Sequence, residues 1–268
     1  MGSTRLPGKS LRPLAGRTIL GLLLERLRGC RELDAVVVAT STRSIDDSIA
    51  NLAESHGVPC VRGSEEDVLA RFNQALSEMP AESVVRICAD NPLTDPEQVD
   101  ALVRFFHGRA CDYAYNNRPE CGLPSGLGAE IVSAGVLRRL HERVTMAVDR
   151  EHVTLAILRQ PNLFKIETLT APPALSYPEL RLDVDCEEDL TRLDCICRLL
   201  RPGAEPHWAT SELIDLLRAR PELLGTRRHD VPSNIPEGTD DPLYAKRIKM
   251  IKCPSDVTGR THESVRHG

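Results

Sequence analysis

Residues 1–9 read M-G-S-T-R-L-P-G-K, and they combine two glycines, two hydroxyl side chains and two cations with little apolar surface to bury. Gly2 and Gly8 allow backbone conformations that other residues avoid, and they let the main chain approach a ligand closely. Arg5 and Lys9 supply the positive charge that binds a polyphosphate. The stretch predicts a phosphate-binding loop, although it lacks the spacing of a Walker loop and a solvated tail would have a similar composition.

Helix and strand patterns alternate along the chain that follows. Helical patterns occupy residues 18–28, 44–56, 67–78, 97–106, 134–142, a segment from 149, 187–200 and 210–224. Strand patterns occupy residues 34–40, 59–61, 83–89, 111–117, 130–133, 165–169 and 179–184. This alternation predicts an α/β fold with a doubly wound, mostly parallel sheet.

Polar residues follow three of the predicted strands. They are residues 39–41 (A-T-S), 62–64 (R-G-S) and 90–91 (D-N). Ligands of doubly wound sheets collect at the carboxyl ends of the strands, so these three segments are predicted to line one crevice.

Composition excludes several classes of protein. Hydrophobic residues make up 41% and charged residues 27% of the 268 residues, as in ordinary globular proteins. A net charge of −5 argues against a nucleic-acid surface despite 34 Lys and Arg residues. The nine cysteines form no C-x-x-C pair, which argues against a zinc ribbon or a secreted disulfide framework. Without a signal peptide or a membrane-spanning apolar stretch, the protein is expected in the cytoplasm, away from membranes.

Six blocks of sequence occur in the order of a known family. They read S-T-R-L-P-G-K-S-L-R-P-L-A-G-R-T-I-L, V-V-V-A-T-S, R-G-S-E-E-D-V-L-A-R-F, R-I-C-A-D-N-P-L, E-H-V-T and R-L-D-V-D-C-E-E-D-L. Together they resemble the cytidylyltransferases of the spore-coat polysaccharide protein F group and, more distantly, the acylneuraminate and 3-deoxy-manno-octulosonate cytidylyltransferases. The resemblance implies a Rossmann-like sheet of the nucleotide-diphospho-sugar transferase type. It also implies Mg²⁺-dependent transfer of CMP from CTP to a small acidic acceptor, with release of pyrophosphate.

The resemblance runs from residue 3 to about residue 225, so residues 1–225 are predicted to be a cytidylyltransferase-like catalytic domain. Residues 226–268 are rich in prolines, glycines and charges, and they predict an extended or partly disordered tail. Family members usually enter the first loop from a buried strand that ends in Gln-Ala-Arg, and this chain begins just after that point. The first strand of the sheet is therefore expected to be missing from the given chain.

Three aspartates are candidate metal ligands. Transfer of a nucleotidyl group requires positioning and neutralisation of charge, which Mg²⁺ held by one or two carboxylates can supply. Asp183 and Asp185 alternate on a predicted strand and would share one face. Taken alone, Asp185 is equally well explained as a helix cap and Asp90 as a turn residue. The resemblance matches Asp90 and Asp185 with the family's metal-binding aspartates, and it also matches Asp183 with the aspartate pair of acylneuraminate relatives.

The resemblance also assigns a nucleotide site. It matches Arg5 and Lys9 with the residues that grip the triphosphate, so the expected catalytic residues are Arg5, Lys9, Asp90 and Asp185. The remaining nucleotide-binding candidates are Gly2 and Ser3 of the loop, with Ala39, Thr40, Arg62 and Arg71 around the base. An ordinary solvated charge is the alternative interpretation of Arg62.

The acceptor region departs from the family pattern. Its candidates by resemblance are Tyr115, Asn116, Gly126, Glu130, Glu151 and His152. The usual block P-R-G-x-D-x-E reads P-S-G-L-G-A-E at residues 124–130, so serine and glycine replace an arginine and an aspartate. The hypothesis is that the acceptor differs from that of ordinary members and is a non-sugar hydroxyl, a phosphate or a phosphonate. His152 is a candidate general base, or a histidine that only satisfies its neighbours at the start of a helix.

Two other functions fit the same sequence. A glycosyltransferase would use a finished sugar nucleotide and an Asp-x-Asp metal site on a similar sheet, but it would not need the S-T-R-L-P-G-K loop. An inactive paralogue would keep the sheet as a scaffold for a partner. Many relatives are dimers, and a homodimer is a possible assembly here.

Overall fold

The computed structural model describes residues 5–200 and 208–224. The chain divides into two compact units, Met1–Arg228 and His229–Gly268, and the described residues all belong to the first. Gly2, Ser3 and the predicted tail at 226–268 lie outside the described residues, so the boundary at residue 225 stays a prediction. Among the described residues, no helix combines the length and the apolar character needed to cross a membrane.

The N-terminal loop leads into a hairpin and a buried helix. Gly8 takes the left-handed conformation, with φ of 67°, and the 3₁₀ helix η1 (Lys9–Leu11) begins directly after it. Strands β1 (Pro13–Leu14) and β2 (Arg17–Thr18) pair antiparallel. The Thr18 hydroxyl accepts a hydrogen bond of 3.0 Å from Gly21 N and so caps helix α1 (Ile19–Leu27).

A parallel pair of strands follows α1. Strand β3 (Val38–Ser41) pairs with β4 (Cys60–Gly63), and Thr40 lies opposite Arg62. The crossover between them contains η2 (Ser44–Asp46) and helix α2 (Asp47–Ser55). After β4, Asp67 caps helix α3 (Val68–Glu78) by accepting from Ala70 N at 2.9 Å.

The larger sheet has four strands in the order β5, β7, β6, β8. Their bounds are Ser83–Arg86 for β5, Tyr113–Tyr115 for β6, Glu130–Ser133 for β7 and Ile166–Thr168 for β8. β7 runs antiparallel to β5 and β6, and β8 runs parallel to β6. Three of the four strands therefore point the same way, and their carboxyl ends meet at one edge of the sheet.

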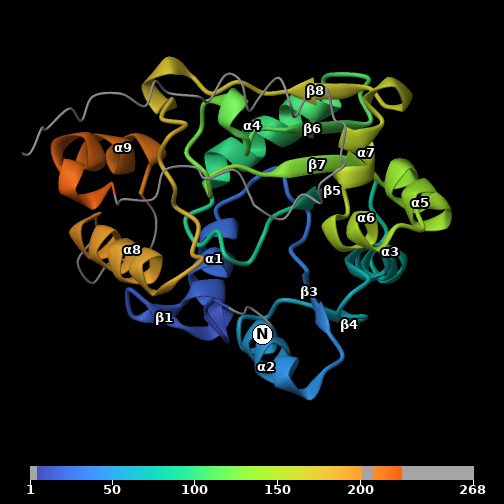
Figure 1. Ribbon diagram of the computed structural model, residues 1–268, viewed down its shortest axis with the longest axis horizontal. Helices are drawn as coiled ribbons and strands as arrows, with labels where there is room; N and C mark the ends of the chain where they lie inside the picture. Colours follow the sequence, from blue (N-terminus) through green and yellow to red (C-terminus); the bar gives the residue numbers. More distant parts are fainter. Residues whose placement is uncertain (1–4, 201–207, 225–268) are drawn as a thin grey trace, which may run out of the picture. The chain divides into compact units, whose positions relative to one another are not determined.

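Helices cover both faces of this sheet (Figure 1). Ala114 and Ile131 on one face pack with helix α4 (Pro96–His107), whereas Tyr113 and Val132 on the other face pack with α5 (Ala134–Arg143) and α7 (Leu155–Arg159). This alternation follows from the two-residue period of a strand. The α/β fold predicted from the sequence is confirmed, and so are the predicted helices apart from the end of the last one.

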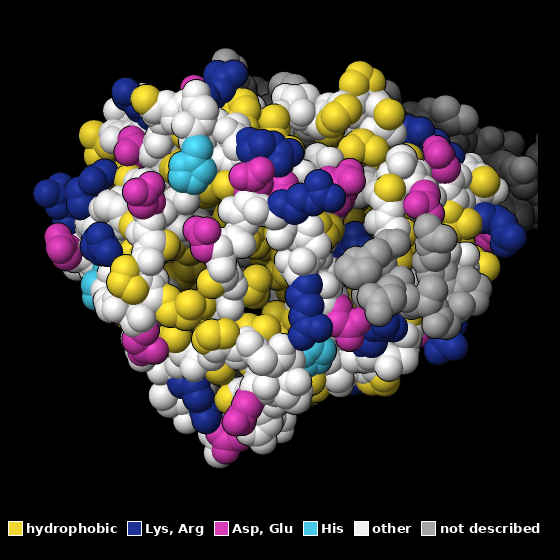
Figure 2. All heavy atoms as spheres, turned by 180° about the vertical axis from the view of Figure 1, so that it is seen from behind, with side chains coloured by type: hydrophobic (Ala, Val, Ile, Leu, Met, Phe, Trp, Pro, Cys, Tyr) yellow, Lys and Arg dark blue, Asp and Glu magenta, His cyan; other side chains and the backbone are white. Residues whose placement is uncertain are grey.

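The remaining elements follow β8 or connect the strands. The 3₁₀ turns are η3 (Pro119–Cys121), η4 (Pro161–Leu163), η5 (Pro173–Leu175) and η6 (Pro221–Leu223), and the helices are α6 (Ala147–His152), α8 (Glu187–Leu200) and α9 (Thr210–Ala219). α8 and α9 pack with α1 in one apolar cluster that includes Ile19, Leu193 and Leu213. Seen from behind, hydrophobic side chains line a hollow in the middle of the molecule, with charged side chains around it (Figure 2).

Two segments of the predicted secondary structure differ from the structure. Residues 179–184 form no strand and make only an isolated parallel bridge between Ser125 and Arg181. Helix α9 ends at Ala219 rather than Leu224, because Pro221 lacks the N–H that would continue the ladder. The cap of α9 is Ala209, since Thr210 donates its hydroxyl hydrogen bond to Asp95 instead.

The sheet is also divided. In the described part of the chain, β3 and β4 form one sheet and β5, β7, β6 and β8 form another, with no ladder between β3 and β5. Strand β3 is shorter than the predicted 34–40, and Asp34 and Ala35 ahead of it are exposed. The expectation about a preceding first strand concerns residues before Met1, and it stays a prediction.

Candidate active site

Three distant segments meet because their apolar residues share one core. Leu6, Leu93 and Val184 all belong to the same buried cluster, and each is at most 3% exposed. Each apolar residue has a charged site candidate close to it in the chain, so burying the cluster brings Lys9, Asp90 and the 183–185 segment together. A backbone hydrogen bond of 2.9 Å from Val184 N to Asp90 O fixes the last two segments to each other.

The Lys9 ammonium lies at the centre of this meeting point. It donates to Asp90 Oδ2 at 2.6 Å, to the Val184 carbonyl at 3.2 Å and to Asp185 Oδ1 at 3.5 Å. Arg5 adds an ion pair of 3.1 Å with Asp185 Oδ2. Burial lowers the pKa of Lys9, but the charges and hydrogen bonds of Asp90 and Asp185 raise it by more, so the net shift is upward. The four residues predicted to be catalytic are therefore brought together.

Asp183 has a different set of partners. The Ser125 hydroxyl donates to Asp183 Oδ1 at 2.9 Å, and the guanidinium of Arg181 pairs with Asp183 and, at 3.1 Å, with Asp185 Oδ2. Burial raises the pKa of Asp183, but Arg181 and Ser125 lower it more, so the group is held ionised. Although residues 179–184 are not a strand, Asp183 and Asp185 still lie side by side, because both contact Arg181.

Arg181 is a site residue that sequence reasoning missed. Its signal was the spacing R-x-D-x-D at residues 181–185, which places the three charged side chains on one side of an extended segment. Two neighbouring carboxylates repel each other unless a cation lies between them. Arg181 supplies that cation for Asp183 and Asp185.

This cluster, which we call the Lys9 cluster, contains Arg5, Lys9, Arg181, Asp90, Asp183 and Asp185. Asp90 and Asp185 both contact one ammonium group, so the two carboxylates are placed to share a single cation. Carboxylate oxygens suit a hard cation such as Mg²⁺. Within residues 5–200 and 208–224, no group of three or more His, Cys, Asp or Glu side chains is arranged as a metal site. A metal ion held by this pair would complete its shell with phosphate oxygens and water.

Three of the four residues predicted to bind the base, Ala39, Thr40 and Arg62, lie on the β3–β4 pair, and Arg71 lies on α3. Thr40 lies opposite Arg62 in the ladder, and Ala39 lies opposite Val61. Arg62 Nε donates to the Ser41 carbonyl at 2.9 Å, and Arg71 donates to the Ser64 carbonyl at 2.8 Å. The arginines therefore brace the loops that follow the two strands, and their role toward a base stays a prediction.

The predicted acceptor residues fall into three groups. Tyr115 and Glu130 are paired across β6 and β7 at the carboxyl edge of the sheet. Asn116 is buried and bonds Ala129 N at 2.8 Å and the Gln98 carbonyl at 3.0 Å, so its amide is used within the fold. Glu151 and His152 are exposed on α6, and Thr154 contacts Glu130 instead, at 3.0 Å.

Gly126 is required by packing. Its φ is +90°, and a Cβ at this position would lie 2.8 Å from the carbonyl carbon of Leu182. A side chain here would therefore push away the segment that carries Asp183. We interpret Gly126 as the residue that lets the 124–130 loop approach the Lys9 cluster.

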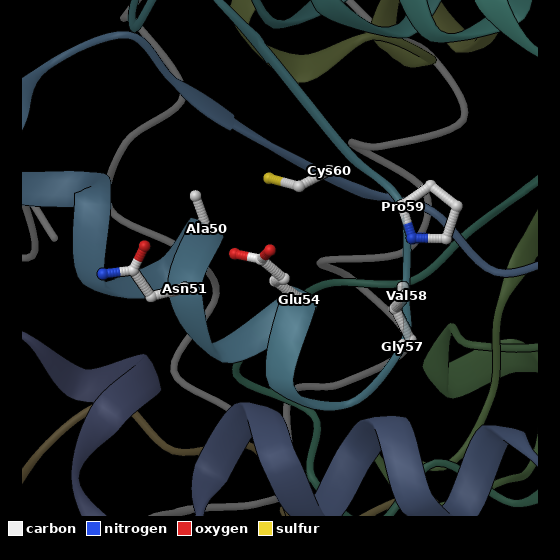
Figure 3. Close-up of a pocket in the computed structure, with 7 residues that line it drawn as sticks. All are labelled: Ala50, Asn51, Glu54, Gly57, Val58, Pro59 and Cys60. Atoms are coloured by element: carbon white, nitrogen blue, oxygen red, sulfur yellow. The ribbon is translucent and has the colours of Figure 1, made fainter.

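A separate surface pocket lies between α2 and β4 (Figure 3). It is lined by Ala50, Asn51, Glu54, Gly57, Val58, Pro59 and Cys60. None of the residues predicted to bind a nucleotide, a metal or an acceptor belongs to this lining.

Several known proteins are similar to this chain in sequence. A family model described as "Cytidylyltransferase" matches residues 1–192. The spore coat polysaccharide biosynthesis protein SpsF of Bacillus subtilis (strain 168) is 34% identical over 236 residues, which cover 86% of this chain and 95% of that protein. The 3-deoxy-manno-octulosonate cytidylyltransferase of Anaeromyxobacter sp. (strain Fw109-5) is 35% identical over 111 residues, covering 40% of this chain and 43% of that protein.

The fold has a solved counterpart. The structure of a cytidylyltransferase from Leptospira borgpetersenii serovar Hardjo-bovis (strain JB197) superposes with a TM-score of 0.79 at 28% sequence identity. The match covers 85% of this chain and 94% of that one. The α/β architecture is thus the Rossmann-like fold of nucleotidyltransferases.

Proposed function

Because the chain belongs to the cytidylyltransferase family, we propose that it transfers the cytidylyl group of CTP to a small acidic acceptor in a magnesium-dependent reaction that releases pyrophosphate. The observation that carries the proposal is the contact of Lys9 with both Asp90 and Asp185. This contact supports the proposal, because transfer of a nucleotidyl group requires a cation near the phosphates and carboxylates that can hold a metal ion.

Each charged side chain of the Lys9 cluster has a role in this reaction. Arg5 and Lys9 bind the triphosphate and offset the negative charge that develops on the leaving pyrophosphate. Asp90 and Asp185 hold the magnesium ion, which would neutralise charge on the phosphates when it is bound. Arg181 pairs with both Asp183 and Asp185 and holds them in position, so it is a positioning residue. No side chain is needed as a covalent nucleophile, because the acceptor oxygen attacks the α-phosphorus directly.

The acidic nature of the acceptor is supported by the relatives. The 3-deoxy-manno-octulosonate cytidylyltransferases are named for a sugar acid. Ser125 and Gly128 replace the arginine and the aspartate of the family block, so the acceptor of this protein is proposed to differ in the part that faces these residues.

Release of pyrophosphate tests the proposal. The full chain is incubated with Mg²⁺ and CTP, ATP, GTP or UTP, together with a panel of acceptors that includes 3-deoxy-manno-octulosonate, N-acetylneuraminate and small phosphonates. We expect pyrophosphate only with CTP and an acidic acceptor, and none after EDTA is added.

A matched pair of variants locates the activity. Lys9→Met removes the central cation and should lower the rate by about 100-fold or more. Arg139→Gln alters an exposed arginine on α5, outside the Lys9 cluster, and should not change the rate. A preference for a nucleotide other than CTP, or equal rates for the two variants, would show that the assignment is wrong.

A further inference from the structure

A second group of charges lies at the carboxyl edge of the four-stranded sheet. Arg86 ends β5, Glu130 begins β7 opposite it, and Tyr115 ends β6 on the other side of Glu130. Arg118 follows β6, and its guanidinium carbon lies 5.0 Å from the centre of the Tyr115 ring. We call Arg86, Arg118 and Glu130 the edge triad. Carboxyl edges of such sheets are where ligands bind.

Glu130 holds the two arginines in place. Its carboxylate accepts from Arg86 NH1 at 2.9 Å, from Arg118 NH2 at 3.3 Å and from the Thr154 hydroxyl at 3.0 Å. Burial raises the pKa of Glu130, but Arg86 and Arg118 lower it more, so the carboxylate stays ionised. The edge triad therefore carries two positive charges and one negative charge.

The edge triad has one positive charge that Glu130 does not compensate, and its arginines have N–H donors that can bind a ligand. The side chains of Arg86 and Arg118 are 21% and 26% exposed, whereas that of Glu130 is only 5% exposed. The side chains of the two arginines are thus more exposed than that of their carboxylate partner. In the part of the chain that the structure describes, Arg118 Nε and the side-chain oxygen of Asn117 are buried without a hydrogen-bond partner. Buried polar atoms usually have such a partner, so this edge of the sheet is built for a further polar group.

The edge triad is next to the Lys9 cluster. Asp90 follows Arg86 by four residues along the chain, and Cys88 lies between them. The 124–130 segment also joins the two groups, because it ends at Glu130 and its Ser125 hydroxyl donates to Asp183 of the Lys9 cluster at 2.9 Å. A molecule bound at the edge triad would therefore lie close to a nucleotide bound at the Lys9 cluster.

We propose that Arg86 and Arg118 form an anion subsite that binds the negatively charged group of the acceptor. This inference rests on the proposed function, and it names the contact that selects an acidic acceptor. A planar guanidinium can grip a carboxylate, phosphate or phosphonate with two parallel hydrogen bonds. The anion would neutralise the one positive charge of the two arginines that Glu130 does not compensate. A neutral acceptor would leave this positive charge uncompensated, so the subsite discriminates by charge.

Sulfate is a suitable probe, because it is a weak nucleophile that carries the same charge and tetrahedral shape as a phosphate group. Sulfate is titrated into the full chain preloaded with CTP and Mg²⁺, so that the triphosphate site is occupied, and the side-chain Nε–H signals of the arginines are followed by NMR. We expect the signal of Arg118 to shift with saturable binding. Arg118→Gln should weaken that binding by about tenfold or more, since it removes a hydrogen bond to a charged group.

Control variants separate binding from folding. Arg118→Lys keeps the charge but loses the planar fork, and it should bind sulfate with intermediate affinity. Arg139→Gln should bind sulfate like the unchanged protein. All variants should retain the same affinity for CTP, because the edge triad does not contact the nucleotide's phosphates in this proposal.

Each outcome of the titrations either supports the anion subsite or overturns it. Loss of sulfate binding in Arg118→Gln with unchanged CTP affinity supports the subsite. Sulfate binding that is absent in the unchanged protein, equal in Arg118→Gln, or lost together with CTP affinity overturns it. The sulfate titration is repeated without CTP. If the protein does not bind CTP, the proposed function is refuted, and the anion subsite is then judged by whether Arg118→Gln weakens sulfate binding in this second titration. With an active enzyme, sulfate should compete with the acceptor and not with CTP.

Discussion

The Lys9 cluster and the edge triad are neighbouring groups of charges that are built in opposite ways. Lys9, Asp90 and Asp185 come from loops up to 176 positions apart, and their mutual ion pairs hold them. Arg86 and Glu130 are instead opposite partners in a hydrogen-bonded ladder. The side chain of Asp90 is 27% exposed, whereas that of Glu130 is 5% exposed. The first group is held by ion pairs between partly exposed side chains, and the second group is fixed by the sheet.

This contrast predicts which changes reduce activity and which reduce the free energy of unfolding. Ion pairs between partly exposed groups contribute little to the free energy of unfolding. Removing one partner of a buried pair leaves an uncompensated charge and is costly. Changes in the Lys9 cluster should therefore reduce activity with little loss of stability, and changes at Glu130 should reduce stability first.

The largest expected effect is on activity. Asp90→Asn removes a carboxylate that we assign to the metal and should lower the rate of pyrophosphate release by about 10³-fold. The free energy of unfolding should change by less than about 1 kcal/mol. Rate assays and urea denaturation measure the two quantities. Asp215→Asn, on the exposed surface of α9, is the control and should alter neither. An Asp90→Asn protein that unfolds as readily as a Glu130 variant would contradict the comparison.

Glu130→Gln should have the next largest effect, and it should be on stability. The change leaves Arg86 and Arg118 facing each other without the carboxylate between them, at a cost of about 3 kcal/mol. Urea denaturation followed by circular dichroism gives the value. Glu167→Gln on strand β8 of the same sheet is the matched control, because its side chain is 42% exposed and should cost less than about 0.5 kcal/mol. Equal losses in the two variants would show that the edge triad is not a buried charge network.

The smallest expected effect is a difference in pH response between the two groups. The pKa of Glu130 is lowered in the folded protein, because its arginine partners outweigh the effect of burial. Its contribution to stability is thus fully present above the unfolded pKa of about 4.3 and is lost as pH falls through the folded pKa. The pKa of Lys9 is raised, so its contribution is present below the unfolded pKa of about 10.4 and is lost as pH rises through the folded value.

Urea denaturation across pH measures both contributions. The difference in unfolding free energy between the unchanged protein and Glu130→Gln should be constant between pH 8 and about 5 and shrink below about 4.3. The difference for Lys9→Met should instead shrink above about pH 10.4. A Glu130 difference that grows in acid would reverse the sign of this assignment.

The sequence predicted local elements well where a single signal dominated. β7 was predicted at Glu130–Ser133 and α8 at Glu187–Leu200, and both have those bounds in the structure. Charges near helix starts and β-branched runs are local signals, so neighbouring residues carry them. The 179–184 strand was wrong because an apolar alternation can bury its side chains in a loop as well as in a sheet. Leu180, Leu182 and Val184 do exactly that in the core beside Leu6 and Leu93.

Most residues of the candidate site could also be predicted from the sequence. Arg5, Lys9, Asp90 and Asp185 were named from their chemistry and from the family resemblance, and the structure brings them together. Arg181 was missed, because the spacing R-x-D-x-D at residues 181–185 was used only for its two aspartates. The pairing of Arg86 with Glu130 could not be predicted from the sequence either, since 44 positions separate the two residues.

By itself, the sequence determined the α/β class, the family and the candidate residues for phosphate and metal, because composition, local periodicity and short motifs depend on neighbouring residues. Only the tertiary structure decided which charges neighbour one another. Lys9 meets Asp90 because Leu6, Leu93 and Val184 are buried in one core, and Arg86 meets Glu130 because β5 and β7 share a register. Such long-range contacts follow from burial and strand pairing, which depend on the whole chain.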